Sequence, residues 1–161
     1  MTIHPPSLRF RQAQVADVPT LSQLVRESMT VWPYTARQLS AWHDSLAIES
    51  SDVMDLQVAE MDGQIVGFFG LSLKLGGWRL EHMWVARHLV GQGVGRVLMQ
   101  RCLAVASSLG IAEVLIYAEP GAAAFYRAMG AEHLGFIRAP VIEQPDRVLP
   151  LFSLAIPLRE E

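Results

Sequence analysis

The chain has 161 residues, enough for one domain with a sizeable core, and 51% of them are apolar against 18% charged, which excludes wholesale disorder. Acidic residues outnumber basic ones by 16 to 13, so the net charge of −3 offers no basic excess for sequence-independent binding of nucleic acid. A single cysteine, Cys102, excludes a disulfide framework, and no apolar run approaches the ~20 residues of a membrane span. We therefore expect one cytoplasmic domain over residues 1–161, with no signal peptide and no nucleic-acid or membrane partner.

The first part of the chain predicts one strand and two helices. Residues 8–11 alternate in polarity like a short strand, after an amino-terminal tail that ends at Pro6. Asp17 is a candidate N-cap for a helix whose inward face is Leu21, Leu24, Val25 and Met29. An aromatic loop over residues 32–34 precedes a second helix, which Thr35 can cap and whose common face is Leu39, Trp42 and Leu46.

The middle of the chain predicts an antiparallel meander of three strands. Residues 56–58 alternate in polarity, Asp62 and Gly63 form a strong hairpin turn, and residues 65–73 continue as a strand. Two consecutive glycines then break the pattern before a further strand over residues 78–85.

A glycine-rich segment and a helix follow the meander. Gly91, Gly93 and Gly95 precede a helix that ends at Gly110 and has one apolar side, made of Val94, Leu98, Cys102, Val105 and Leu109. Residues 114–117 are then a short apolar strand. This strand–helix–strand sequence implies a right-handed parallel crossover.

The last part of the chain predicts one helix and a hairpin. Pro120 opens the helix, Gly130 closes it, and its expected inward residues are Ala122, Phe125 and Met129. Residues 133–137 and 148–156 are expected to pair, with Pro150 favouring a sheet edge. The element order β-α-α-β-β-β-α-β-α-β-β predicts an α/β domain with a mixed sheet of about seven strands, one parallel pair and about four flanking helices. A ligand is expected at the parallel junction.

The glycine segment has the composition of an anion-binding loop. Alternating glycines let successive backbone N–H groups approach an anion, and the dipole of the following helix adds partial positive charge. No Gly-Lys-Ser/Thr follows, so this is not a Walker loop, and Arg96 stands where the dinucleotide-binding fingerprint has its third glycine. The alternative is a tight strand-to-helix turn without a ligand.

Two motifs carry a resemblance to a known family. Residues 80–85 (LEHMWV), followed by residues 91–99 (GQGVGRVLM), look like the acyl-CoA motif of the GNAT N-acetyltransferases. Residues 119–130 (EPGAAAFYRAMG) resemble that family's other signature, an Ala-x-x-Phe-Tyr-x-x-x-Gly helix. The motifs stand in the family's order, and the β-α-α-β-β-β lead-in also matches, so the likeness covers nearly the whole chain.

The resemblance implies that acetyl-CoA is the co-substrate and that main-chain groups hold it. Its pyrophosphate would be bound by the loop residues Val90, Gly91, Gln92, Gly93, Val94, Gly95 and Arg96. Its pantetheine arm would pair with the backbone of Met83 and Val85, with Trp84 between them, where a bulge typical of the family splays this strand from its parallel neighbour. The family usually has Arg or Gln at the position of Val90 and often Asn at that of Gly121, so we expect looser CoA binding here.

The resemblance also places Tyr126 near the CoA sulfur. A phenol with an ordinary pKa of ~10 is protonated at neutral pH and can donate a proton to a departing thiolate. We expect Phe125 to fill the inward position of this helix and to leave Tyr126 for the acid role. The alternative is a core aromatic residue.

The base has two candidates on one strand. Glu81 comes first, on family likeness, and His82 second, for its convenient pKa of ~6.5. Neighbours on a strand face opposite ways, so only one of them is expected to meet the amine, unless the bulge turns both inward. The alternative is that these are ordinary strand charges. The backbone amide of Met83 or Trp84 is the candidate donor to the oxyanion.

Together these observations predict an acetyl-CoA-dependent N-acetyltransferase that moves the acetyl group to a primary amine of an unidentified acceptor by direct attack. The alternative is a non-catalytic acyl-CoA-binding or sensing module. The histidines show no metal-ligand spacing, so we predict no metal site. A homodimer is a further expectation, with the carboxy-terminal hairpin as its surface through Leu149, Leu151 and Phe152.

Overall fold

A computed structural model describes residues 7–44 and 46–157 of the chain, so the predicted amino-terminal tail lies outside the described residues. The strands are β1 (Arg9–Gln12), β2 (Leu56–Met61), β3 (Gln64–Lys74), β4 (Gly77–Val85), β5 (Glu113–Tyr117), β6 (Glu132–Arg138) and β7 (Val148–Ala155). The α-helices are α1 (Val18–Met29), α2 (Ala36–Ala41), α3 (Val94–Ser108) and α4 (Ala123–Ala128). Short 3₁₀ helices lie at Val15–Asp17, Ser50–Asp55, Arg87–Leu89 and Pro120–Ala122.

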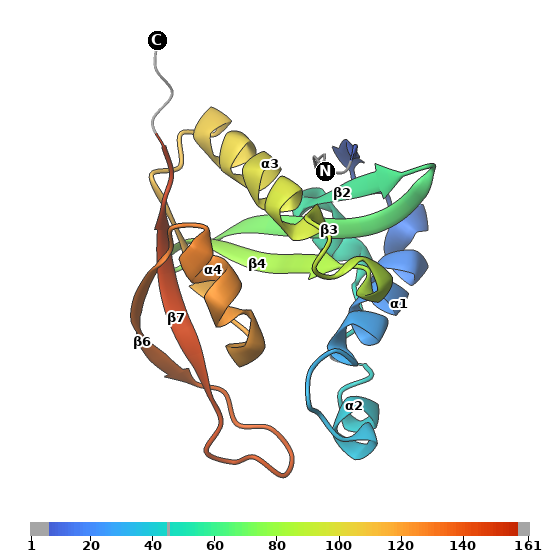
Figure 1. The fold of residues 1–161 in the computed structure, drawn as a ribbon, viewed down its shortest axis with the longest axis vertical. Helices are drawn as coiled ribbons and strands as arrows, with labels where there is room; N and C mark the ends of the chain where they lie inside the picture. Colours follow the sequence, from blue (N-terminus) through green and yellow to red (C-terminus); the bar gives the residue numbers. More distant parts are fainter. Residues whose placement is uncertain (1–6, 45, 158–161) are drawn as a thin grey trace, which may run out of the picture. The chain divides into compact units, whose positions relative to one another are not determined.

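The strands form one mixed sheet in the order β1-β2-β3-β4-β5-β7-β6 (Figure 1). β2 and β3 are a hairpin whose turn residues Asp62 and Gly63 have φ angles of 53° and 79°, the left-handed values that such tight turns require. β4 and β5 run parallel, with the register pair Arg79↔Leu115. The predicted α/β fold, a mixed sheet with one parallel pair, is therefore confirmed.

The chain divides into two compact units. The first comprises the described residues up to Gly70 together with His82–Gln100, and the second comprises Leu71–Glu81 and the described residues from Arg101 onward. β3, β4 and α3 each begin in one unit and end in the other.

The core of the first unit lies between α1 and the β2–β3 hairpin. The predicted inward face of α1 is confirmed, because its four apolar residues are each at most 6% exposed. They belong to one cluster with the buried strand residues Leu56, Val58 and Phe68. α1 begins at Val18, and Pro19 occupies its first turn.

The core of the second unit lies on one face of β5 and β7. The register pairs Val114↔Leu154 and Ile116↔Phe152 put four apolar side chains on that face, each at most 4% exposed. α4 covers them, since the ring of Tyr126 lies 6.1 Å from the ring of Phe152. Figure 1 shows α4 lying across β7.

Asp17 precedes α1 as predicted, but its side chain does not cap that helix. Its two carboxylate oxygens instead accept hydrogen bonds from Arg11 at 2.8 and 2.9 Å, and one of them also accepts the Gln14 N–H. This charge-assisted pairing with Arg11 holds the pKa of Asp17 below its usual range. The prediction is wrong on this point because β1 brings a guanidinium to the site, which sequence spacing does not show.

The second predicted helix is real but short. Thr35 caps α2 by accepting the Gln38 N–H at 3.0 Å, and the Gln38 side chain accepts the Thr35 N–H in return, a complete capping box. α2 ends at Ala41, so Trp42 is its C-cap and Leu46 lies beyond it. These two side chains are half-buried against the core of the first unit all the same.

Two further predictions are corrected by the structure. Leu109 is 58% exposed, because α3 ends at Ser108 and the chain turns before Leu109 can join the buried face. Pro150 lies on an internal strand, since β7 runs between β5 and β6. It is tolerated there because it stands one position beyond the last register pair with β5, where its carbonyl accepts the Ala118 N–H at 3.0 Å and no N–H is demanded of it.

Candidate functional site

The glycine loop of the first unit has the backbone conformation that its sequence predicts. Gly91 and Gly93 have φ angles of +82° and +90°, a region that side chains with a Cβ rarely adopt. The 3₁₀ helix Arg87–Leu89 leads into this turn, and α3 begins directly after it at Val94. Gly95 therefore lies in the first turn of α3 and not in the loop itself.

The N–H groups of this segment fall into two sets. Those of Val90 and Gln92 donate within the turn, to the carbonyls of Arg87 at 3.3 Å and Leu89 at 3.2 Å. The first intrahelical bond of α3 joins the Val97 N–H to the Gly93 carbonyl at 3.2 Å. The three amides before it, on Val94, Gly95 and Arg96, thus have no acceptor within the helix. They sit at the positive end of the helix dipole, as an anion-binding turn requires.

A glycine in β3 lets α3 lie close to the sheet. A Cβ on Gly67 would come within 2.8 Å of the Leu98 side chain and of the Trp84 carbonyl oxygen. Leu98 and Val94 are both fully buried, so the first turns of α3 are seated firmly on this part of the sheet. The direction of the loop amides is consequently fixed by packing as well as by backbone torsions.

The last residues of β4 present main-chain groups on the side away from β3. The Ala86 N–H donates to Val66 of β3 at 2.8 Å, and successive residues of a strand alternate in the neighbour that they face. Val85 and Met83 therefore face away from β3. In agreement, the Val85 carbonyl accepts a hydrogen bond from the hydroxyl of Ser28 on α1 at 2.8 Å. The Val85 N–H, and the N–H and carbonyl of Met83, are left for another partner.

His82 and Trp84 lie on the core-facing side of β4 in the first unit. The indole N–H of Trp84 donates to His82 Nδ1 at 3.2 Å, and the His82 ring lies 5.8 Å from the ring of Phe68. Gly70 makes room for it, because a Cβ there would lie 3.3 Å from the imidazole carbon Cδ2. His82 is thus packed into an aromatic environment, with Nδ1 already engaged.

Glu81 lies among charged side chains of the second unit. Its carboxylate is 3.5 Å from Lys74 Nζ and 3.6 Å from Arg79 Nη1, and the side chain is 29% exposed. Arg79 in turn donates from Nη2 to the Tyr117 hydroxyl at 2.9 Å. Sequence reasoning missed Arg79 and Tyr117. The signal for Arg79 was its i, i+2 spacing from Glu81 in a strand, whereas Tyr117 enters only through the parallel register.

Tyr126 is the most deeply buried residue of α4, at 7% exposure, whereas Phe125 is half-buried. The expectation that Phe125 fills the inward position is therefore wrong. The two rings meet edge to face at 5.3 Å. Burial, and secondarily the nearby Cys102, raises the pKa of Tyr126 above its ordinary value, so the phenol is protonated at neutral pH. Among the described residues we find no hydrogen bond to its hydroxyl.

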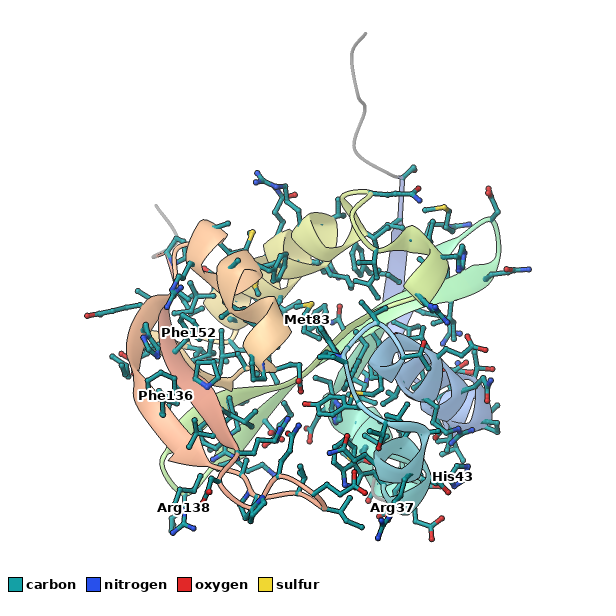
Figure 2. All side chains as sticks on the ribbon, turned by 60° about the horizontal axis from the view of Figure 1, so that its bottom comes forward. Arg37, His43, Met83, Phe136, Arg138 and Phe152 are labelled. Atoms are coloured by element: carbon teal, nitrogen blue, oxygen red, sulfur yellow. The ribbon has the colours of Figure 1, made fainter. Side chains whose placement is uncertain are left out.

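Other predicted residues are more peripheral. Val90 is 50% exposed, and Gly121 is exposed in the 3₁₀ helix before α4. Phe152, offered as part of a dimer surface, is fully buried, because it faces α4. The most exposed of the described apolar residues on this hairpin are instead Phe136, at 64%, and Leu134, at 51%, and Figure 2 labels Phe136 and Phe152.

Metal-ligand clusters and membrane-spanning helices are both absent from the described residues. No three His, Cys, Asp or Glu side chains there form a group that could hold a metal ion. No helix in the same part of the chain is long and apolar enough to cross a membrane.

The fold and the loop together define a class of α/β protein. In this class the first strand of the parallel pair, here β4, leads into a helix, here α3, whose first backbone N–H groups are left without partners in the helix. The family model of the acetyltransferase (GNAT) domain matches residues 20–138. The chain therefore belongs to the GNAT acetyltransferase family, as its two motifs predict. A search among curated proteins finds no match.

Solved structures of N-acetyltransferases share this fold. A GCN5-related N-acetyltransferase from Rhodopseudomonas palustris has a TM-score of 0.76 at 19% identity, over 96% of this chain and 98% of that one. The PaiA N-acetyltransferase from Thermoplasma acidophilum, solved in complex with coenzyme A, has a TM-score of 0.69 at 17% identity, over 92% and 99%. The ribosomal-protein alanine N-acetyltransferase from Escherichia coli has a TM-score of 0.69 at 15% identity, over 96% and 97%.

Proposed function

We propose that this protein is an acetyl-CoA-dependent N-acetyltransferase that transfers the acetyl group to a primary amine by direct attack. The observation that carries the proposal is the loop at Gly91 and Gly93, with its two positive φ angles, opening directly into the 15-residue helix α3. That arrangement is an anion cradle. In a chain of the GNAT family, the anion that it fits is the CoA pyrophosphate.

The cradle would hold CoA mainly through main-chain amides. Those of Gly91, Gly93, Val94, Gly95 and Arg96 are the donors that the turn and the helix do not use themselves. The Val85 N–H and the main chain of Met83 would pair with the pantetheine arm, on the side of β4 away from β3. Acetyl-CoA supplies an activated acyl group on a thiolate leaving group.

Tyr126 is the proposed general acid. During transfer the amine nitrogen forms a bond to the acetyl carbon, the carbon–sulfur bond breaks, and the sulfur leaves as a thiolate. Because burial raises its pKa, the phenol is protonated at neutral pH, so a proton is present for the departing thiolate. Its hydroxyl, free of hydrogen bonds among the described residues, is available to donate.

Glu81 is the proposed base, and the Met83 N–H is the proposed donor to the carbonyl oxygen. Glu81 is partly exposed, so its carboxylate can take the amine proton directly or through a water. His82 is less suited, because its Nδ1 accepts from Trp84 and its ring is packed against Phe68. Met83 is favoured over Trp84 as the oxyanion donor, because the backbone N–H of Trp84 is directed at the neighbouring strand β3.

The second candidate function is a non-catalytic acyl-CoA-binding module. The favouring observation is that Val90 and Gly121, which stand where the family often has polar side chains that help to hold CoA, are exposed and offer no polar side chain. This reading predicts CoA binding without turnover of any amine.

The decisive experiment has two stages. Calorimetric titration with acetyl-CoA and CoA, with ATP and NAD as controls, should show saturable binding of the CoA compounds alone. A screen of primary amines that measures release of free CoA thiol should then show turnover. Binding without turnover would favour the non-catalytic module, and absence of CoA binding would overturn both functions.

A further inference from the structure

We propose that Arg79 is a binding site for a carboxylate on the acceptor, so that the enzyme acts on amines with a carboxylate close to the amino group, as in an α-amino acid. This inference rests on the proposed function and specifies its substrate class. The residues that carry it all lie in the second unit: Lys74, Arg79, Glu81 and Tyr117.

Tyr117 holds the guanidinium of Arg79 in one place. The guanidinium carbon lies 4.0 Å from the centre of the Tyr117 ring, and Nη2 donates to the hydroxyl of the same residue at 2.9 Å. Stacking and hydrogen bonding by one side chain fix both the plane and the rotation of the guanidinium. The pair forms because the parallel register places Arg79 beside Leu115, two residues before Tyr117. Such preorganisation lowers the entropic cost of binding an anion.

Most hydrogen-bonding capacity of Arg79 remains unused. A guanidinium offers several N–H donors in a rigid fork that matches a carboxylate, and the Tyr117 hydroxyl takes one of them. The Nε atom is buried with no partner among the described residues, and the contact of Nη1 with Glu81, at 3.6 Å, is longer than a hydrogen bond. The side chain is still 27% exposed, so an anion from solvent can reach its outer edge.

Arg147, in the same unit, is an arginine whose two terminal nitrogens both donate hydrogen bonds within the protein. Its Nη2 donates to the Glu119 carboxylate at 3.0 Å and its Nη1 to the Ala139 carbonyl at 3.2 Å. These bonds tie the two ends of the β6–β7 connection to the end of β5. Arg147 therefore has a structural task, whereas Nε and Nη1 of Arg79 are held in position without a hydrogen-bond acceptor among the described residues.

Glu81 provides the matching site for the amine. Arg79 and Glu81 are two residues apart on β4 and so share one face of the sheet, with their charged groups 3.6 Å apart. A zwitterion with adjacent ammonium and carboxylate groups can lie against both, exchanging one loose ion pair for two opposite-charge contacts. Lys74, 3.5 Å from Glu81, leaves the cluster with one net positive charge, which favours an acceptor with an anionic group.

The test compares matched acceptors that differ only in the carboxylate. Each of several α-amino acids is assayed beside its primary amide and its decarboxylated amine, with acetyl-CoA saturating and thiol release as the readout. We expect kcat/KM for the free acids to exceed that for their amides by about 10- to 100-fold, the range for hydrogen bonds to a charged group. In Arg79→Gln the three members should react within about threefold of one another.

Two further variants separate binding from folding. Arg138→Gln removes an exposed arginine at the end of β6, which extends away from the ribbon in Figure 2, and should keep the full preference. Tyr117→Phe keeps the stacked ring and loses the hydroxyl, so it should reduce the preference by a few-fold. It also serves as the test variant if Arg79→Gln does not fold, as judged by its thermal midpoint.

The outcomes distinguish this inference from the proposed function. Equal rates for acid and amide in the wild type, or a preference that survives Arg79→Gln, would overturn the carboxylate site while leaving the acetyltransferase intact. If no amine is turned over, calorimetry of the CoA-loaded protein with the same acids and amides decides: selective binding of the acids, abolished by Arg79→Gln, supports the site, and no binding overturns it. Failure of CoA binding itself contradicts the proposed function instead.

Discussion

The glycine loop and the charged face of β4, which carries Arg79 and Glu81, would bind their ligands through different kinds of groups. The loop offers main-chain amides whose direction is set by local torsions at Gly91 and Gly93. The face offers side chains, and Arg79 meets Tyr117 only through a parallel register between segments 38 residues apart in sequence. A site built from backbone tolerates changes of side chain that keep the torsions. A site built from side chains depends on the identity of each member, so a single substitution can change its specificity.

The largest effect is expected at Tyr126, which belongs to the side-chain-built machinery. Tyr126→Phe should lower kcat by about 100- to 1,000-fold, the usual contribution of a general acid, with CoA affinity unchanged. The ring contacts with Phe125 and Phe152 are kept and no hydrogen bond is lost, so the thermal midpoint should stay near the wild-type value. Thiol-release kinetics and calorimetry measure the two quantities. An unchanged kcat would remove Tyr126 from the acid role.

Glu81→Gln is expected to follow, with a loss in kcat of about 10- to 100-fold that rising pH partly restores, because more of the amine is then already deprotonated. His82→Gln is the matched variant on the adjacent residue and should cost less than about fivefold. A pH–rate series on both variants makes the comparison. The reverse order of effects would assign the base to His82.

Gly93→Ala tests the backbone-built site. A Cβ at φ +90° costs about 1–2 kcal/mol of strain, which the loop relieves by turning its amides away. We expect acetyl-CoA affinity to fall about tenfold in a calorimetric titration. Gly110→Ala is the control, since Gly110 has φ +73° at the other end of the same helix and should lose similar stability without losing affinity. Equal affinity in both variants would show that the loop does not bind the ligand.

Val90→Arg tests whether a charged side chain increases the CoA affinity of a site made of main-chain amides. Val90 is exposed and its own N–H serves the turn, so a longer side chain can be added without disturbing the fold. A new charge-assisted contact at a solvent-exposed position is worth about 0.5–1 kcal/mol, so we expect CoA affinity to rise by about two- to fivefold, and the gain to shrink at high salt. Titration at two ionic strengths measures it. A salt-independent change would argue against a phosphate contact.

The last effect is on stability and not on activity, and it concerns Cys102, which lies near Tyr126. Burial raises the pKa of the Cys102 thiol to about 12, well above that of an unfolded cysteine. The neutral thiol therefore contributes stability that is complete below pH ~8.5 and is lost as pH rises towards 12, at up to about 1.4 kcal/mol per pH unit. Urea unfolding at pH 8 and pH 10 should show a steeper decline in the wild type than in Cys102→Ala. Parallel declines would contradict a buried, neutral Cys102.

Sequence patterns predict most of the fold, because the deciding signals are local. The hairpin at Asp62 and Gly63, the cap at Thr35 and the apolar face of α1 each depend on residues within a few positions of one another. The glycine loop belongs to the same category. Errors arise where another element competes, as when Arg11 of β1 takes the carboxylate of Asp17 or when β7 inserts between β5 and β6 and makes Pro150 internal.

The sequence by itself determined the family, the order of the elements and the main-chain cradle, since torsional preference and helical periodicity act over short distances. Only the tertiary structure decided that Tyr126 is buried more deeply than Phe125, that His82 packs against Phe68, and that Arg79 meets Tyr117. Those relations come from strand register and helix packing, which join residues far apart in the chain. A one-dimensional pattern carries no record of which distant partner satisfies a charge or covers a ring.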